Sequence, residues 1–144
     1  MQIVFAVKGR QNLIPSSKRE TLHKYIAGIV ANKGQKLLAV FAMPDHVHLL
    51  IGLKPAMAIA DLVREIKTAT SVFIKANNWT SAKFEWQAGY GAFSYSRSHI
   101  DQVIRYILNQ EQHHAKKSFK DEYTSILKNF GIDYKEAFLF DWLT

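Results

Sequence analysis

Cysteine is absent from this chain of 144 residues. Its absence excludes disulfide bonds and thiolate metal sites, so any metal ion would have to be held by imidazole, carboxylate, amide oxygen or water. Glycine and proline are scarce, and they form no low-complexity segment or linker that would divide the chain. We therefore expect a single domain over residues 1–144, a length that suits one hydrophobic core.

Long hydrophobic runs are absent as well. No apolar stretch approaches the roughly 20 residues needed to cross a bilayer, and residues 1–5 lack the basic-then-apolar layout of a signal peptide. These absences favour a cytoplasmic protein with no membrane partner.

Acidic residues are outnumbered, because the chain has 12 Asp and Glu against 19 Lys and Arg and a formal net charge of +7. Such a balance favours a polyanionic partner, of which nucleic acid comes first. The charges are spread along the chain rather than gathered in a basic tail, so the charge alone is a weak argument.

Two histidines stand two residues apart in the apolar run of residues 43–51. The run predicts a β-strand entered through a Pro-Asp turn. Side chains on a strand alternate between faces, so His46 and His48 would lie on the same face, about 6.6 Å apart along the strand. Two imidazoles in that position can bind one cation from the same side. For an isolated His-x-His pattern, however, two histidines on a solvated sheet face are the more frequent arrangement.

Hydrophobic periodicity predicts the element order β-α-β-β-α-β, followed by two further helices. This order is that of the ferredoxin-like α+β fold, an antiparallel sheet with helices on one face, here with additional C-terminal helices. Two pairs, Ser17 with Glu20 and Ser98 with Asp101, have the spacing of capping boxes at helix starts. Strands are expected over about residues 3–8, 37–43, 46–53 and 84–96, and helices over about residues 17–33, 57–77, 98–108 and 118–130.

The third predicted helix has an apolar stripe from Ile100 to Leu108. Tyr106 and Gln110 stand one turn apart beside this stripe, separated by about 40° around the helix axis. A phenol oxygen can act as a nucleophile when a cation polarises its electrophile, and an amide oxygen can complete a hard-cation site that two imidazoles begin. Taken alone, such a pair more often means a half-exposed core tyrosine beside a solvated glutamine.

Three segments, in this order, resemble the signature of the insertion-sequence-200-type transposases, the small single-tyrosine members of the HUH (His-hydrophobe-His) endonucleases. The segments are Met43 to Leu50, Trp86 to Ser94 and Tyr106 to His114. The resemblance extends over nearly the whole chain. It implies the palm fold of the HUH endonucleases and a DNA transposase that cuts and rejoins single-stranded DNA at hairpin-marked element ends.

The resemblance also implies a role for each signature residue. His46, His48 and Gln110 would hold one Mg²⁺ or Mn²⁺ ion on the scissile phosphate. Tyr106 would attack the phosphorus, which forms a 5′-phosphotyrosine link and a free 3′-OH, and a second strand end would reverse the reaction. Members of the family usually act as homodimers in which the tyrosine helix of one subunit completes the metal site of the other.

A set of polar side chains could contact DNA phosphates. Most of them lie on the second predicted helix, where a solvated helix face is an equally good interpretation, and one lies in the first turn, where an arginine usually contacts nothing of consequence. These residues are Arg10, Arg64, Lys67, Thr68, Ser71 and Lys75.

Aromatic side chains of the fourth predicted strand could stack on unpaired bases, although a place in the core or in a dimer interface is the more frequent one. Of the other histidines, three are expected at the surface and His113 could carry a proton. The aromatic residues are Trp86, Tyr90, Phe93 and Tyr95, and the surface histidines are His23, His99 and His114.

Two other functions remain open. A non-catalytic or repurposed module on the same fold could bind DNA or RNA hairpins with its catalytic residues unused. A regulatory domain for a small ligand is disfavoured by the basic charge and by the pairing of Tyr106 with Gln110.

Overall fold

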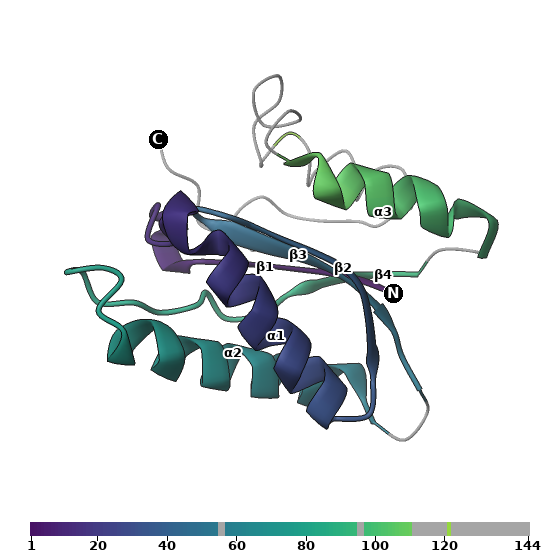
Figure 1. Cartoon of the computed structure of the whole chain (residues 1–144), viewed down its shortest axis with the longest axis horizontal. Helices are drawn as coiled ribbons and strands as arrows, with labels where there is room; N and C mark the ends of the chain where they lie inside the picture. The colour runs from purple at the N-terminus through teal and green to yellow at the C-terminus, as the bar shows by residue number, and fades with distance from the viewer. Residues whose placement is uncertain (55–56, 95–96, 111–120, 122–144) are drawn as a thin grey trace.

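The computed structural model describes residues 1–54, 57–94, 97–110 and 121. Its four strands pair antiparallel in the order β2-β3-β1-β4, which confirms the ferredoxin-like α+β fold (Figure 1). The predicted helix over 118–130 and the residues Tyr95, His113 and His114 lie outside the described residues. The elements are β1 (Gln2–Ala6), α1 (Arg19–Asn32), β2 (Lys36–Met43), β3 (His46–Gly52), α2 (Ile59–Ala76), β4 (Gly91–Phe93) and α3 (Ile100–Leu108).

Helices cover both faces of the sheet. Helices α1 and α2 lie on one face, as expected for the ferredoxin-like body, and the C-terminal helix α3 lies on the other (Figure 1). Within the described residues, no helix is long and apolar enough to span a membrane. Because both faces are covered, the central strands β1 and β3 are buried along almost their whole length.

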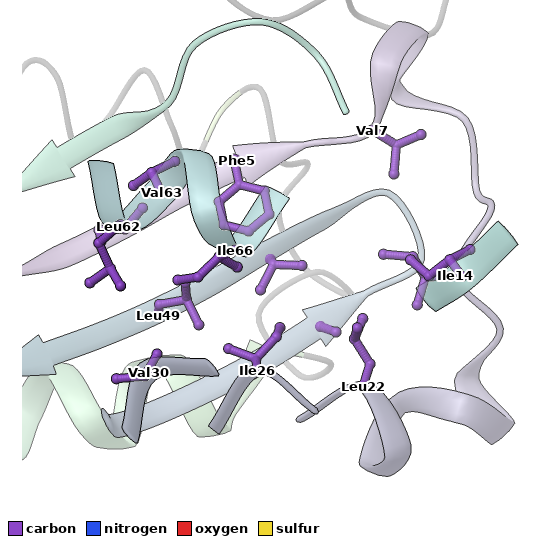
Figure 2. Packing of buried hydrophobic residues seen from close by; sticks show 14 of the residues in the cluster. Phe5, Val7, Ile14, Leu22, Ile26, Val30, Leu49, Leu62, Val63 and Ile66 are labelled. Atoms are coloured by element: carbon purple, nitrogen blue, oxygen red, sulfur yellow. The ribbon is translucent and has the colours of Figure 1, made fainter. Parts of the chain in front are cut away.

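The larger hydrophobic core lies between the sheet and helices α1 and α2. In Figure 2, Phe5 and Leu49 of the sheet meet Ile26 of α1 and Ile66 of α2. The residues of β3 alternate strictly, since Val47, Leu49 and Ile51 belong to this core and the residues between them face α3. A shift of one residue in the register of β3 would exchange these two faces, so the core fixes which way the histidines point.

A second, smaller core joins α3 to the other face of the sheet. Val103 and Ile107 of α3 pack against Ala39 of β2 and Leu50 of β3. Leu108 was expected in the buried stripe, but it is 51% exposed. It follows Ile107 by about 100° around the helix axis, which turns it away from the sheet.

The fourth strand is much shorter than predicted. Among the described residues of this segment, Gly91–Phe93 forms the strand that pairs with β1, and Trp86 makes an isolated bridge to Val7. Gly89 has a φ of +87°, which turns the chain. The ammonium group of Lys67 donates hydrogen bonds to the backbone carbonyls of Gln87 and Gly89. These carbonyls therefore bond to a side chain instead of to a ladder.

Neither predicted capping box forms. Each serine lies within a 3-10 turn that precedes the helix, Ser16–Lys18 before α1 and Arg97–His99 before α3. The N-cap positions are consequently Lys18 and His99. The backbone amide of Arg19 donates to the carbonyl of Ser16, so a 3-10 bond satisfies a donor that a capping side chain would otherwise take.

The expectation that His23 lies at the surface is wrong. Its side chain is largely buried beside Phe41, and its Nε2 atom accepts a hydrogen bond from the backbone amide of Ala42 at 2.9 Å. This bond requires a neutral ring. Burial lowers the pKa of His23, Glu20 partly offsets the shift and Arg19 adds to it.

The free energy of unfolding should therefore fall as the pH drops below the ordinary histidine pKa of about 6.5. Below that pH the unfolded chain binds a proton at His23 that the folded chain resists, and protons bound preferentially by the unfolded state destabilise the fold. Urea unfolding at pH 7.5 and 5.5 measures the effect, which should be smaller in His23→Gln than in wild type. The exposed His99, replaced as His99→Gln, is the control; an identical pH dependence in His23→Gln would contradict this role.

Candidate active site

Strand β3 carries both histidines of the His-x-His pattern on the face that α3 covers. Their rings are fully buried, with centroids 5.1 Å apart and planes at 75°. The alternative of two histidines on a solvated sheet face is therefore wrong. His46 pairs with Met43 across the hairpin and His48 with Phe41, so the β2–β3 turn and the larger core together place the two rings side by side.

Each ring uses its Nδ1 atom for a contact with a protein side chain. His46 Nδ1 lies 2.6 Å from Oδ1 of Asp45, and His48 Nδ1 lies 3.1 Å from the side-chain amide nitrogen of Gln2. A ring that donates its Nδ1 proton to an acceptor can bind a metal ion through Nε2, as His46 can beside the Asp45 carboxylate. The side-chain nitrogen of Gln2 is a donor, so His48 accepts from it through Nδ1. The Nε2 atoms of both rings are buried.

Asp45 connects the site to Arg10. The guanidinium group of Arg10 bonds Oδ2 of Asp45 through Nε, at 2.8 Å, and through Nη2. Burial alone would raise the pKa of Asp45, but the hydrogen bond and charge of His46, followed by those of Arg10, outweigh burial and lower the pKa to about 2. The carboxylate is therefore ionised at neutral pH and acts only as an acceptor.

Helix α3 brings Tyr106 to the histidines of its own chain. The Tyr106 ring is half-buried and meets the His48 ring edge-on, with centroids 6.2 Å apart and planes at 82°. The adjacent Ile107 is fully buried against the sheet, and Tyr106 packs at the edge of the same core. The packing of α3 thus sets the position of the phenol.

Gln110 follows one turn after Tyr106 and is fully buried. Its amide nitrogen donates to the carbonyl of Tyr106 at 3.2 Å, and an amide oxygen is the kind of atom that binds a hard cation. Within the described residues, no group of three or more His, Asp or Glu side chains is arranged to hold a metal ion. Among the described residues, a third protein ligand beside His46 and His48 would be of another type, and an amide oxygen fits a divalent ion.

Most of the chain matches the model of a known protein family. The model of the family described as "Transposase IS200 like" matches residues 1–110. The chain belongs to this family. The IS200-like transposase is 28% identical over 115 residues to the ISDra2 transposase TnpA of Deinococcus radiodurans, with 75% of this chain and 81% of that protein covered.

Two solved structures resemble this IS200-like transposase. The first is a crystal structure of a candidate transposase from Deinococcus radiodurans, with a TM-score of 0.58, 28% identity, and 76% of this chain and 88% of that chain covered. The second is a REP-associated tyrosine transposase bound to a REP hairpin, with a TM-score of 0.57, 17% identity, and 78% of this chain and 66% of that chain covered. The second likeness shows a shared fold.

The residues predicted to contact DNA fall into two groups in the IS200-like transposase. Arg64 and Lys75 are exposed on α2, where Arg64 also forms an ion pair with Asp61 at 3.1 Å, and Ser71 is half-buried between them. Lys67 is half-buried instead, and burial lowers its pKa. Arg10, whose side chain is only 12% exposed, is paired with Asp45. Their contacts with DNA remain predictions.

Two hollows border α2, the helix that lies on the sheet face opposite α3 (Figure 1). A cavity of about 630 Å³ is lined by Lys8, Lys67, Thr68, Ser71 and residues 85–88. A smaller cavity of about 340 Å³ shares Lys67 and Thr68 and extends to Arg64 and Tyr90. The aromatic side chains of residues 86–93 belong mainly to the core, since Trp86 packs on Phe5 and Phe93 is buried.

Sequence reasoning missed two residues at the site. Asp45 directly precedes His46 in the sequence, and this adjacency could have indicated that its carboxylate contacts the imidazole ring. Gln2 is a polar residue at the start of an otherwise apolar strand, and it is fully buried. A buried amide needs a partner, which in this fold is His48.

Proposed function

We propose that this IS200-like transposase cuts and rejoins single-stranded DNA through Tyr106, with Mg²⁺ or Mn²⁺ held by His46, His48 and Gln110. The observation that carries the proposal is the contact between the rings of Tyr106 and His48 within one chain. This contact brings a phenol beside two buried imidazoles, which is the combination of nucleophile and cation site that phosphoryl transfer needs.

The reaction is a transfer of the phosphoryl group between two oxygens. The phenol oxygen of Tyr106 forms a bond to phosphorus as the bond to the 3′ oxygen breaks. The phenol loses its proton and the departing 3′ oxygen gains one, so no water or external energy source is consumed. When bound, the ion would neutralise charge that develops on the scissile phosphate. The reverse attack by a 3′-OH rejoins the strands.

The residues of the site are suited to these tasks. The Asp45 carboxylate holds His46 through Nδ1, which is the arrangement in which Nε2 can bind an ion, and β3, buried along its length, keeps the two rings side by side. The half-buried phenol ring packs at the edge of the α3 core, which fixes its position. A site with neutral ligands and a divalent ion is cationic, which favours a phosphate.

We extend the partner class from the neighbour solved with a REP hairpin, so the substrate is single-stranded DNA with hairpin ends. The net charge of +7 supports a nucleic-acid partner. A homodimer that exchanges the tyrosine helix remains a prediction, and the contact of Tyr106 with His48 of the same chain supports a site assembled within one subunit.

The test is a strand-cleavage assay on a labelled single-stranded oligonucleotide with the hairpin of the element's own end. The proposal predicts cleavage with Mg²⁺ or Mn²⁺ and none with a chelator. Tight binding of the correct end sequence with no cleavage in either ion would instead indicate a module that only binds hairpins.

The exposed cations of α2 should contribute to hairpin binding. Replacing Arg64 and Lys75 together by Ala is expected to weaken binding and to reduce the slope of log K against log salt by about 2, since each lost phosphate contact lowers it by about 1. Fluorescence anisotropy at several salt concentrations measures this slope. Lys24→Ala, an exposed lysine of α1, is the control. A slope equal to that of wild type in the double variant would place the hairpin elsewhere.

A further inference from the structure

Three side chains form a continuous row of hydrogen bonds that ends at the candidate active site. Arg10 bonds one oxygen of Asp45, Oδ2, with Nε at 2.8 Å. The other oxygen, Oδ1, lies 2.6 Å from Nδ1 of His46. The side chains of Arg10 and Asp45 are each 12% exposed, so the row is shielded from water over most of its length.

Backbone hydrogen bonds connect Arg10 and Asp45 of this row through Val7. The amide of Val7 donates to the carbonyl of Asp45 at 2.8 Å, and the amide of Arg10 donates to the carbonyl of Val7 at 2.9 Å. Arg10 itself has a φ of +56°, in the left-handed region that non-glycine residues rarely adopt. The chain thus keeps Arg10 in a disfavoured conformation, and its side chain meets Asp45 across the end of β1.

The chemistry of the row dictates where the proton of the His46 ring lies. An ionised carboxylate can only accept, so the short contact with Asp45 requires a proton on Nδ1 of His46. A neutral ring with its proton on Nδ1 has its lone pair on Nε2. Arg10 occupies the opposite oxygen of Asp45, and two bonds from one planar guanidinium group orient the carboxylate toward the ring.

We propose that Arg10 and Asp45 are positioning residues that fix His46 in the tautomer and orientation required to bind the divalent ion through Nε2. The inference rests on the proposed function, because it assigns His46 as a metal ligand. It gives Arg10 a task inside the site in place of the DNA contact expected from the sequence. Carboxylates that hold metal-binding histidines in this way raise metal affinity in many proteins.

A purely structural ion pair would behave differently. Such a pair would tie the end of β1 to the β2–β3 turn and would affect unfolding, but it would leave metal affinity and the His46 tautomer unchanged. Stability alone cannot separate these roles, since buried ion pairs are weak evidence for a stabilising role. The test therefore needs a direct readout of the ring.

Long-range ¹⁵N–¹H NMR of the imidazole rings in the full chain reports the tautomer without any metal. In wild type, His46 should carry its proton on Nδ1. In Asp45→Asn and Arg10→Gln the ring should show a mixture of tautomers. Titration with Mn²⁺ alone, followed by electron paramagnetic resonance, should give a dissociation constant raised about 10-fold or more in both variants.

Lys33→Gln is the matched control, because it removes the cation of the ion pair that Lys33 forms with Glu65 at 3.4 Å, away from the site. It should bind Mn²⁺ like wild type. Arg10→Lys, which keeps the charge but loses the planar fork, should fall between wild type and Arg10→Gln.

The inference is overturned if His46 in wild type carries its proton on Nε2, or if both variants keep wild-type Mn²⁺ affinity and tautomer. If Asp45→Asn does not fold, the positioning role is tested by the wild-type ring spectrum and by the Arg10 variants. If wild type binds no Mn²⁺, the assignment of a metal ion in the proposed function is wrong. A proton on Nδ1 of His46 that is lost in Arg10→Gln would still support the positioning of the ring by Arg10 and Asp45.

Discussion

Replacing Tyr106 by Phe should abolish strand cleavage and leave hairpin binding close to that of wild type. The substitution removes only the phenol oxygen and keeps the ring that contacts His48 and the α3 core. Loss of a nucleophile lowers turnover by several orders of magnitude, on the order of 10⁴-fold or more. Single-turnover cleavage on denaturing gels measures the rate, and fluorescence anisotropy measures binding.

Tyr25→Phe is the matched control for this experiment. Tyr25 is stacked on Phe73, with ring centroids 4.0 Å apart, on the face of the sheet opposite α3, so loss of its hydroxyl should not change cleavage. If Tyr106→Phe cleaves at the wild-type rate while folding normally, then Tyr106 is not the nucleophile and another group or a water molecule attacks the phosphate.

Replacing His48 by Ala should remove most of the metal-dependent activity. A bound cation stabilises transition-state charge by several kcal/mol, which corresponds to a loss on the order of 10²- to 10⁴-fold in rate. Chelation of wild type should cause a similar loss, which added Mn²⁺ reverses. The variant should not recover at the Mn²⁺ concentration that saturates wild type, because one of two buried imidazoles is gone.

His99→Gln controls for loss of a histidine, since His99 is exposed before α3. Two results would count against a metal site at the histidines. One is wild-type activity that a chelator does not reduce, and the other is an unchanged Mn²⁺ requirement in His48→Ala. Thermal unfolding of each variant separates loss of the site from loss of the fold, because deletion of a buried ring also leaves a cavity.

The core of this fold could be predicted because it depends on local periodicity. Strand β3 reads as a buried strand, and its alternation places Val47 and Leu49 in one core and His46 and His48 on the other face. The order of the elements then leaves few topologies for an antiparallel sheet, and the observed strand order is one of them.

What could not be predicted depends on contacts between distant residues. Arg10 and Asp45 are 35 positions apart, and Gln2 and His48 are 46 apart, so neither pair has a local signature. The shortness of β4 has the same origin, because Lys67 of α2 bonds carbonyls that a longer strand would have used. A tertiary contact also explains why His23 is largely buried and not at the surface as expected, since its Nε2 atom accepts a hydrogen bond from the distant amide of Ala42.

The two faces of the sheet carry different groups of side chains, because different helices cover them (Figure 1). On one face, α3 lies over the histidines with Tyr106 at the edge of its core. On the other, α2 exposes Lys75 and Arg64, and Arg64 lines the smaller hollow. If hairpin binding uses α2, the single strand to be cut must pass around the sheet to reach Tyr106. Separate faces would explain why binding and cleavage should respond to different substitutions.

We propose that Tyr106 becomes covalently joined to DNA when the strand is cut. The measurement is peptide mapping by mass spectrometry of the product formed with Mn²⁺ and the element's own end sequence, after digestion of the DNA and the protein. We expect a nucleotide linked through its 5′ phosphate to the peptide that contains Tyr106, together with a released strand whose 3′-OH a polymerase can extend. Cleavage without any protein-linked DNA, or a link to a different residue, would contradict it.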